Sequence, residues 1–80
     1  MDKLNILIIN GPNLNLLGIR EKHIYGSTTL EDINSTIIKN FDEELVNIDF
    51  YQSNIEGEIV SKIGDSINKY NGIVINPAAY

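Results

Sequence analysis

The chain has 80 residues, of which 42% are hydrophobic and 21% charged, with six Lys and Arg against eleven Asp and Glu. This composition is typical of one small folded domain or part of one. The formal charge of −5 argues against the phosphate backbone of a nucleic acid as partner. The absence of cysteine excludes a disulfide framework and a thiolate metal site, and a reducing cytoplasm is the simplest setting. The longest apolar run, residues 6–9, is far below the roughly 18 residues of a membrane-spanning helix.

The first predicted element is a strand over residues 3–10, where Leu4 and residues 6–9 form an almost continuous apolar run. Such a run is typical of a parallel strand that is covered on both faces. The next stretch, residues 10–26, has no apolar period of its own and contains three glycines and a proline. It is therefore predicted to be a long functional loop.

A helix is predicted after this loop. Thr28 and Thr29 are candidate N-caps, and Thr28 with Glu31 fits a capping box. The apolar positions of the helix have the spacing of a single stripe; they are Leu30, Ile33, Ile37, Ile38, Phe41 and Leu45. Residues 46–52 then mostly alternate apolar and polar, which predicts a strand with one exposed face near a sheet edge.

The second predicted helix starts at Ser53, which with Glu56 offers another capping box. Its apolar stripe comprises Ile59, Val60, Ile63, Ile67 and Tyr70. The helix is expected to stop at Asn71-Gly72, because glycine readily takes the left-handed conformation that ends helices. Residues 73–75 are again continuously apolar and predict a third strand, closed by Asn76-Pro77.

The β-α-β-α-β order predicts an α/β domain with a parallel sheet in which strand one lies between strands two and three. This is the first part of a five-stranded, flavodoxin-like three-layer sandwich with strand order 2-1-3-4-5. Ligands bind such sheets beyond the carboxyl ends of the strands, where the strand order reverses. The loop after strand one and the Asn76-Pro77 turn are expected to meet there.

The sequence reaches Tyr80 just as the third strand ends, which leaves a strand of the buried type without a neighbour. We therefore expect residues 1–80 to be a single flavodoxin-like domain that is truncated on its C-terminal side, or whose open edge is covered by another subunit.

The segment Asn10-Gly11-Pro12-Asn13 has two interpretations. It is either a tight turn, since Asn, Gly and Pro favour turns for steric reasons, or it projects amides into the crevice to hold a hydroxyl or a water. It matches neither the phosphate-binding P-loop pattern nor the dinucleotide-binding glycine pattern. The sequence therefore favours nucleotide binding less than binding of another ligand.

Arg20 and Tyr25 are either a solvated charge and an apolar loop anchor or a catalytic pair. A free tyrosine has a pKa of about 10 and is too weak an acid to be ionised near neutral pH. An adjacent guanidinium favours its phenolate. Arg20 is the candidate cation for such a base. His23 lies between them, and a single loop histidine is more often solvated than catalytic.

The residues also carry a resemblance to a known family. The run INGPNLNLLGIRE at residues 9–21, followed by Tyr25-Gly26 and a Thr-rich helix start, resembles the N-terminal signature of the type II 3-dehydroquinate dehydratases. The blocks YQSNIEGE at residues 51–58 and INPAAY at residues 75–80 are similar to that family's next two blocks. The resemblance spans essentially the whole chain in the same order.

This resemblance implies a lyase of the shikimate pathway, which leads to the aromatic amino acids. The implied reaction is the trans elimination of water from 3-dehydroquinate to give 3-dehydroshikimate, through an enolate and without a cofactor. Tyr25 matches the base, Arg20 the arginine that favours its phenolate, and Asn13 the asparagine that holds a water against the enolate oxygen. Asn76 matches a ligand of a substrate hydroxyl, and the backbone near Ala78 is expected close to the substrate.

The resemblance also implies a homo-oligomer, a dodecamer arranged as a tetramer of trimers. Two departures stand out. Lys22 replaces the usual proline, and the family's general-acid histidine and carboxylate-binding residues lie beyond Tyr80, a role that His23 does not fill. The 80 residues alone are therefore expected to be inactive. Two other classes stay open: a non-catalytic flavodoxin-like module that binds an anion or nucleotide, and an interaction protein whose open sheet edge recruits a partner strand.

Overall fold

The computed structural model describes residues 3–80, with only the backbone of Tyr25. Its elements are β1 (Leu4–Asn10), a short 3-10 helix η1 (Leu14–Leu16), α1 (Lys22–Tyr25), α2 (Leu30–Lys39), β2 (Val46–Gln52), α3 (Glu56–Asp65) and β3 (Gly72–Asn76). The predicted β-α-β-α-β order is confirmed. The long loop after β1 contains two short helices, η1 and α1, that the sequence pattern did not reveal.

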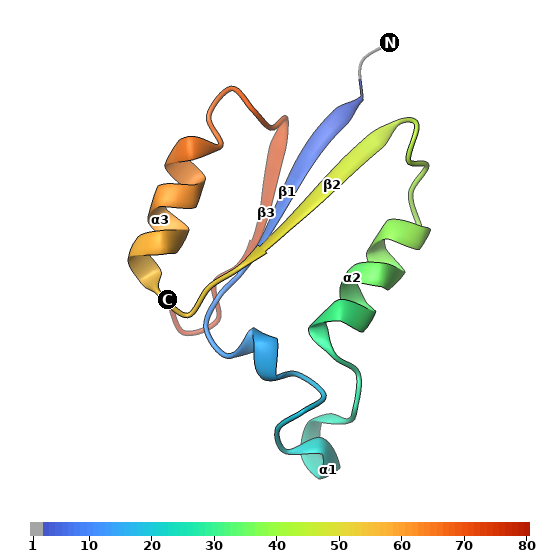
Figure 1. Ribbon diagram of the computed structural model, residues 1–80, viewed down its shortest axis with the longest axis vertical. Helices are drawn as coiled ribbons and strands as arrows, with labels where there is room; N and C mark the ends of the chain where they lie inside the picture. The colour runs from blue at the N-terminus through green and yellow to red at the C-terminus, as the bar shows by residue number, and fades with distance from the viewer. Residues whose placement is uncertain (1–2) are drawn as a thin grey trace.

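The sheet has the order β2-β1-β3, and β1 pairs in parallel with both neighbours. The strand order predicted from the apolar patterns is therefore confirmed. In Figure 1, α2 and α3 flank the sheet on opposite sides. At the carboxyl end of β1, Asn10 lies opposite Gln52 of β2 and Asn76 of β3. Three polar residues thus end the three strands at the same level.

The best-packed part of the core lies between β1 and α3. Leu7 and Ile9, which share one face of β1, are fully buried, and Ile59 of α3 is 5% exposed. Tyr51 and Tyr70 pack against them. β3 is an outer strand of the sheet, and its Val74 remains 58% exposed. The third strand is thus apolar but uncovered in this chain, as its sequence predicted.

Gly11 brings the segments after β1 and β3 together. Its N–H donates to the carbonyl of Asn76 at 2.8 Å. A Cβ atom at Gly11 would overlap the backbone carbonyl of Pro77, so this approach requires glycine. The predicted meeting of the loop and the Asn76-Pro77 turn is confirmed.

The N-terminus of α2 has a capping box, but not the one that the sequence suggested. Thr29 is the N-cap: its Oγ1 accepts from the N–H of Asp32 at 3.1 Å, while Asp32 Oδ2 accepts from the N–H of Thr29 at 3.0 Å. The predicted pair of Thr28 and Glu31 is therefore wrong by one residue. Hydrogen bonding from Thr29, chiefly from its N–H and then from its side chain, favours the ionised carboxylate and holds the pKa of Asp32 below its usual value.

The stripe predicted for this helix extends too far. α2 ends at Lys39, and Phe41 and Leu45 lie beyond it. The side chain of Asn40 donates to the carbonyl of Thr36 at 2.8 Å, and Asp42 Oδ1 then accepts from the N–H of Glu44. Side chains that bond to nearby backbone groups in this way favour turns over helix.

The predicted Ser53–Glu56 capping box is also wrong. The N-cap of α3 is Ile55, without a side-chain cap. Ser53 instead accepts from the N–H of Ile55 at 2.9 Å and donates to Glu58 at 2.5 Å. Ser53 is buried, with 5% of its surface exposed. Its hydroxyl therefore stabilises the turn that leads into α3 rather than the helix terminus.

α3 ends at Asp65, earlier than its stripe predicted, and Asn68, not Gly72, takes the left-handed conformation, with φ of 70°. Gly72 is the first residue of β3. Tyr70 still reaches the core from the connecting turn. Its hydroxyl donates to Asp49 at 2.7 Å, and this bond raises the pKa of Tyr70 because the carboxylate opposes the phenolate.

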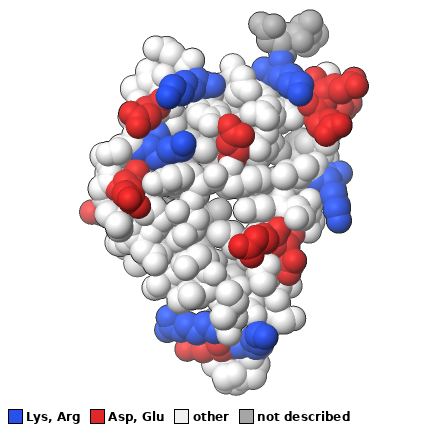
Figure 2. Space-filling view, in the orientation of Figure 1, with Lys and Arg blue, Asp and Glu red and all other residues white. Residues whose placement is uncertain are grey.

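No helix among residues 3–80 is long and apolar enough to cross a membrane. Figure 2 shows acidic and basic side chains interspersed on the visible face of the described chain, rather than a broad basic surface. Charged side chains also gather at the tip where α1 lies in Figure 1.

The capping box predicts a local effect of Thr29→Ala. The change removes Oγ1 and with it the bond from the Asp32 N–H, whereas the N–H of residue 29 can still donate to the Asp32 carboxylate. The pKa of Asp32 should therefore rise only part of the way toward its usual value, which NMR titration of the labelled carboxyl carbon measures. Because the folded-state pKa is lowered, ionised Asp32 stabilises the fold above its unfolded-state pKa, and this contribution disappears as the pH falls through the folded-state value. Thr28→Ala is the matched control. An equal change in both variants would contradict the assignment of Thr29 as the cap.

The close approach at Gly11 predicts that Gly11→Ala destabilises the protein by about 1–3 kcal/mol, the usual cost of overpacking. Urea unfolding measures this change. Gly57→Ala is the control, because that glycine lies in α3 and a Cβ atom there would meet no other atom within 4 Å; alanine there should stabilise the helix by up to about 1 kcal/mol. Equal free energies of unfolding for the two variants would refute the packing argument.

Candidate functional site

The candidate site lies at the carboxyl ends of the strands. Here the N–H of Ser53 donates to the carbonyl of Asn10 at 3.2 Å, and that of Gly11 donates to Asn76. The loop from β1 therefore leaves the sheet between the ends of β2 and β3. This is the position at which parallel α/β sheets bind ligands.

The loop folds back on itself near Gly18. This residue has a left-handed backbone with φ of 75°, and a Cβ atom there would overlap the carbonyls of Ser27 and Thr28. Gly18 therefore closes the loop around η1 and α1. The predicted long loop is an ordered segment whose shape depends on backbone contacts.

Asn13 is the first predicted site residue in this loop. It precedes η1 with a left-handed backbone, φ 66°, and its side chain makes no cap bond to that helix. Its N–H donates to Asn54 Oδ1 at 2.9 Å. The backbone of Asn13 is thus held, while its side-chain amide is available at an exposed position for a hydroxyl or a water.

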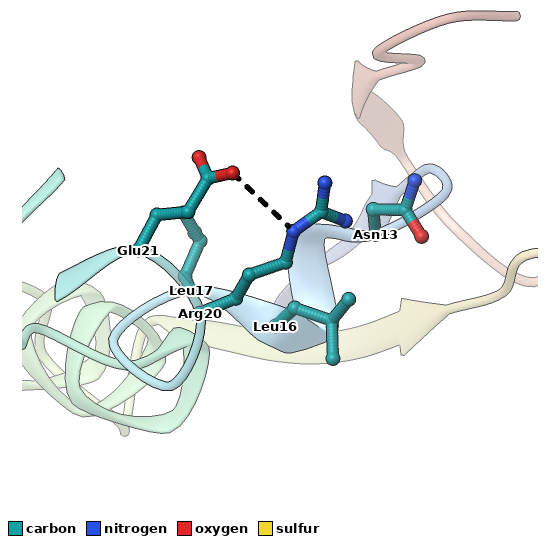
Figure 3. Close-up of a pocket in the computed structure, with 5 residues that line it drawn as sticks. All are labelled: Asn13, Leu16, Leu17, Arg20 and Glu21. Atoms are coloured by element: carbon teal, nitrogen blue, oxygen red, sulfur yellow. Dashed lines mark ion pairs between the residues drawn. The ribbon is translucent and has the colours of Figure 1, made fainter. Parts of the chain in front are cut away.

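Asn13 and Arg20 line the same hollow. It has a volume of about 300 Å³ and is completed by Leu16, Leu17 and Glu21. In Figure 3 the guanidinium of Arg20 extends toward the side on which Asn13 lies. The hollow thus combines two leucines with a cation, an amide and a carboxylate, which are groups that can orient a small, oxygen-rich ligand.

Arg20 makes one ion pair within the described residues, from Nε to Glu21 Oε1 at 3.8 Å, and its side chain is 61% exposed. Such an exposed pair contributes little stability. Glu21 has a left-handed backbone, φ 53°, and is followed directly by α1. The guanidinium is therefore free to be redirected toward a ligand.

Tyr25 is the last residue of α1. Its side chain lies outside the described residues, so its predicted pairing with Arg20 stays a prediction. His23 is exposed on the same short helix, and it is not among the described residues that line the hollow. Among the residues that the structure describes, no cluster of three His, Asp or Glu side chains has the geometry of a metal site.

Asn76 and Ala78 lie at the end of β3. Asn76 Oδ1 accepts from the N–H of Ala78 at 3.3 Å, and Ala78 has a left-handed backbone with φ of 52°. Asn76 therefore retains its side-chain N–H groups for another acceptor. The hollow beside Asn13 does not include Asn76 or Ala78, so the structure places the predicted residues on one edge but not around one cavity.

Two residues at this edge were not predicted to have a role. Gln52 Nε2 donates to the carbonyl of Gly11 at 3.1 Å and to Asn54 Oδ1 at 3.1 Å, and Asn54 in turn holds Asn13. Their sequence signal is weak: both are amides at or just after the carboxyl end of a predicted strand. Only their contacts with the loop after β1, 41 positions earlier in the sequence, reveal their importance.

Known proteins share both the sequence and the fold. The chain is 64% identical over 76 residues to a 3-dehydroquinate dehydratase of Clostridium botulinum, covering 95% of this chain and 52% of that protein. It is 56% identical over 75 residues to a catabolic 3-dehydroquinase of Talaromyces marneffei, covering 94% and 43%. The chain thus spans about half the length of these curated relatives.

The crystal structure of a type II dehydroquinase from Butyrivibrio crossotus is similar, with a TM-score of 0.85 and 48% identity, over 98% of this chain and 55% of that one. A type II dehydroquinase from Propionibacterium acnes gives 0.80 and 35% over the same shares, 98% and 55%. These neighbours confirm the flavodoxin-like fold expected from the sequence. The model of the family described as dehydroquinase class II matches residues 4–80. The chain belongs to the dehydroquinase class II family.

Proposed function

We propose that this chain is the N-terminal part of a type II 3-dehydroquinate dehydratase, a hydro-lyase of the shikimate pathway. The observation that carries the proposal is the family match over residues 4–80. The position of Asn13 and Arg20 around one hollow beyond the strand ends supports it. The reaction removes water from 3-dehydroquinate and leaves the conjugated ketone 3-dehydroshikimate.

In this proposal the Tyr25 phenolate takes the proton from the carbon beside the ketone, and the electron pair of that C–H bond moves into an enolate. Arg20 supplies the positive charge that favours the phenolate and the developing anion. Asn13 holds a water against the enolate oxygen. The enolate then collapses to form the carbon–carbon double bond, while the hydroxyl group leaves with a proton from an acid.

Asn76 binds a substrate hydroxyl in the proposed complex. Its Oδ1 already accepts from the N–H of Ala78, so its N–H groups are the ones that would reach the substrate. The backbone near Ala78 would then lie along the substrate. Its left-handed conformation supports this role, because strained backbone often occurs at ligand sites.

The acid half of the site is proposed to lie beyond Tyr80. Relatives that are about twice as long as this chain support a domain that continues past β3, with two further strands that complete the 2-1-3-4-5 sheet. That continuation would supply the histidine acid and the groups that bind the substrate carboxylate. A cytoplasmic dodecamer, built as a tetramer of trimers, is the assembly that we propose for the complete protein.

A non-catalytic module that binds an anion or nucleotide is the rival function, and the relatives named above do not favour it. The two functions differ in a simple titration of the complete gene product. The dehydratase predicts binding of 3-dehydroquinate that depends on Asn76. Binding of FMN without binding of 3-dehydroquinate would support the rival and refute the dehydratase.

The catalytic roles predict large losses of turnover in the complete gene product. Tyr25→Phe removes the base and should lower kcat by about 10²–10⁴-fold, the usual contribution of general acid–base catalysis. Arg20→Ala should lower kcat and move the acidic limb of the pH–rate profile to higher pH, because a phenol without a neighbouring cation ionises less readily. The absorbance of the conjugated ketone product measures both effects.

Lys39→Ala is the matched control for lost positive charge, since Lys39 is exposed on α2 and has no assigned role. Arg20→Lys keeps the charge and should preserve most of the pH profile. Turnover at the wild-type rate in Tyr25→Phe or Arg20→Ala would overturn the role assigned to that residue.

The role of Asn76 predicts that Asn76→Ala lowers kcat/KM by about 10- to 100-fold, as expected for the loss of a hydrogen bond in a desolvated complex. Asn71→Ala is the control. Asn71 directly precedes β3, but its side chain accepts from the N–H of Asn5 near the amino ends of the strands, away from the candidate site. If Asn71→Ala lowered kcat/KM as much at a temperature where both variants are folded, the hydroxyl contact would be refuted.

A further inference from the structure

Asn54 connects the ends of all three strands. It follows β2, and its Oδ1 accepts from the N–H of Asn13 at 2.9 Å and from Gln52 Nε2 at 3.1 Å. Its backbone carbonyl accepts from the hydroxyl of Tyr80 at 2.5 Å, which follows β3. One asparagine is therefore bonded to the loop after β1, to its own strand and to the segment after β3.

The bond to Asn13 acts at a left-handed position. Asn13 has a φ of 66°, a conformation that is uncommon for residues other than glycine and that Asn adopts more readily than most. Its N–H is one of the groups at the start of η1 that a helix leaves without an internal partner. Asn54 satisfies that group from across the site.

Gln52 favours the same orientation of the Asn54 amide as Asn13 does. Gln52 Nε2 donates both to the carbonyl of Gly11 at 3.1 Å and to Asn54 Oδ1. A donor next to Asn54 requires an acceptor there, so the oxygen of the amide points to Gln52 and Asn13 together. The side chain of Asn54 is thus oriented before any ligand binds.

We propose that Asn54 is a positioning residue for Asn13: it holds the backbone of Asn13 in the left-handed conformation that presents the Asn13 side chain to the hollow. This inference rests on the proposed function, in which Asn13 holds a water against the enolate oxygen. Asn54 itself touches neither the substrate nor that water. It acts through Asn13, with Gln52 fixing its orientation.

A positioning role predicts a particular kinetic effect. Asn13 acts on negative charge that develops during the reaction, so its misplacement lowers kcat more than it weakens substrate binding. Asn54→Leu removes the acceptor at similar volume and should lower kcat by about 10- to 100-fold, with KM within about twofold. Asn54→Asp keeps an acceptor for both donors and should restore most of kcat.

The conformational part is tested separately, by hydrogen–deuterium exchange with mass spectrometry on the complete gene product. The peptide that contains Asn13 should exchange faster in Asn54→Leu and at about the wild-type rate in Asn54→Asp. Gln52→Met, which removes the orienting donor, should change exchange and kcat in the same direction and provides the test if Asn54→Leu does not fold. Asn47→Leu, an exposed asparagine of β2, is the matched control.

Faster exchange with lower kcat in Asn54→Leu, and recovery of both in Asn54→Asp, would support the inference. Wild-type exchange in Asn54→Leu, a rise in KM without a change in kcat, or equal losses in the Leu and Asp variants would overturn it. If the wild-type protein did not turn over 3-dehydroquinate, the proposed function would fail, whereas the exchange of the Asn13 peptide would still decide whether Asn54 holds the loop.

Discussion

The parallel pairing of β1 along both of its edges is the constraint on which the rest of the structure depends. Because the register is shared, Asn10 lies opposite both Gln52 and Asn76. Three side chains that are far apart in the sequence therefore reach one edge of the sheet at the same level. The fully buried residues Leu7 and Ile9 lie just before this edge in β1. The strand ends that carry the candidate site therefore continue directly from the most buried part of the chain.

The fold followed from the sequence because its strands have strong local patterns. The continuous apolar run of β1 and the alternation in β2 predicted their places in the sheet, and β2 has the predicted bounds, Val46–Gln52. Helix ends were less predictable. Several polar residues near each end compete for the same backbone groups, so Thr29 rather than Thr28 caps α2, and Ser53 bonds Glu58 rather than capping α3.

The sequence indicated candidate site residues only where a single side chain or the family resemblance suggested a chemical role. Asn13 and Arg20 lie around one hollow, but local pattern did not show that Asn54 would hold Asn13. Such a contact depends on the relative placement of two loops, which follows from the strand register. The same applies to Gly11, whose need for glycine arises from the carbonyl of Pro77.

The register at Gly11 also limits how this sequence can change during evolution. A deletion of one residue within β3 would exchange the faces of Ile73 and Val74 and would move the carbonyl that Gly11 contacts. Within the connection between α3 and β3, residues 67–69 carry no comparable restriction because they are exposed, whereas Tyr70 reaches the core. Insertions and deletions in natural variants should therefore accumulate in the turn near Asn68, while the length of β3 stays fixed.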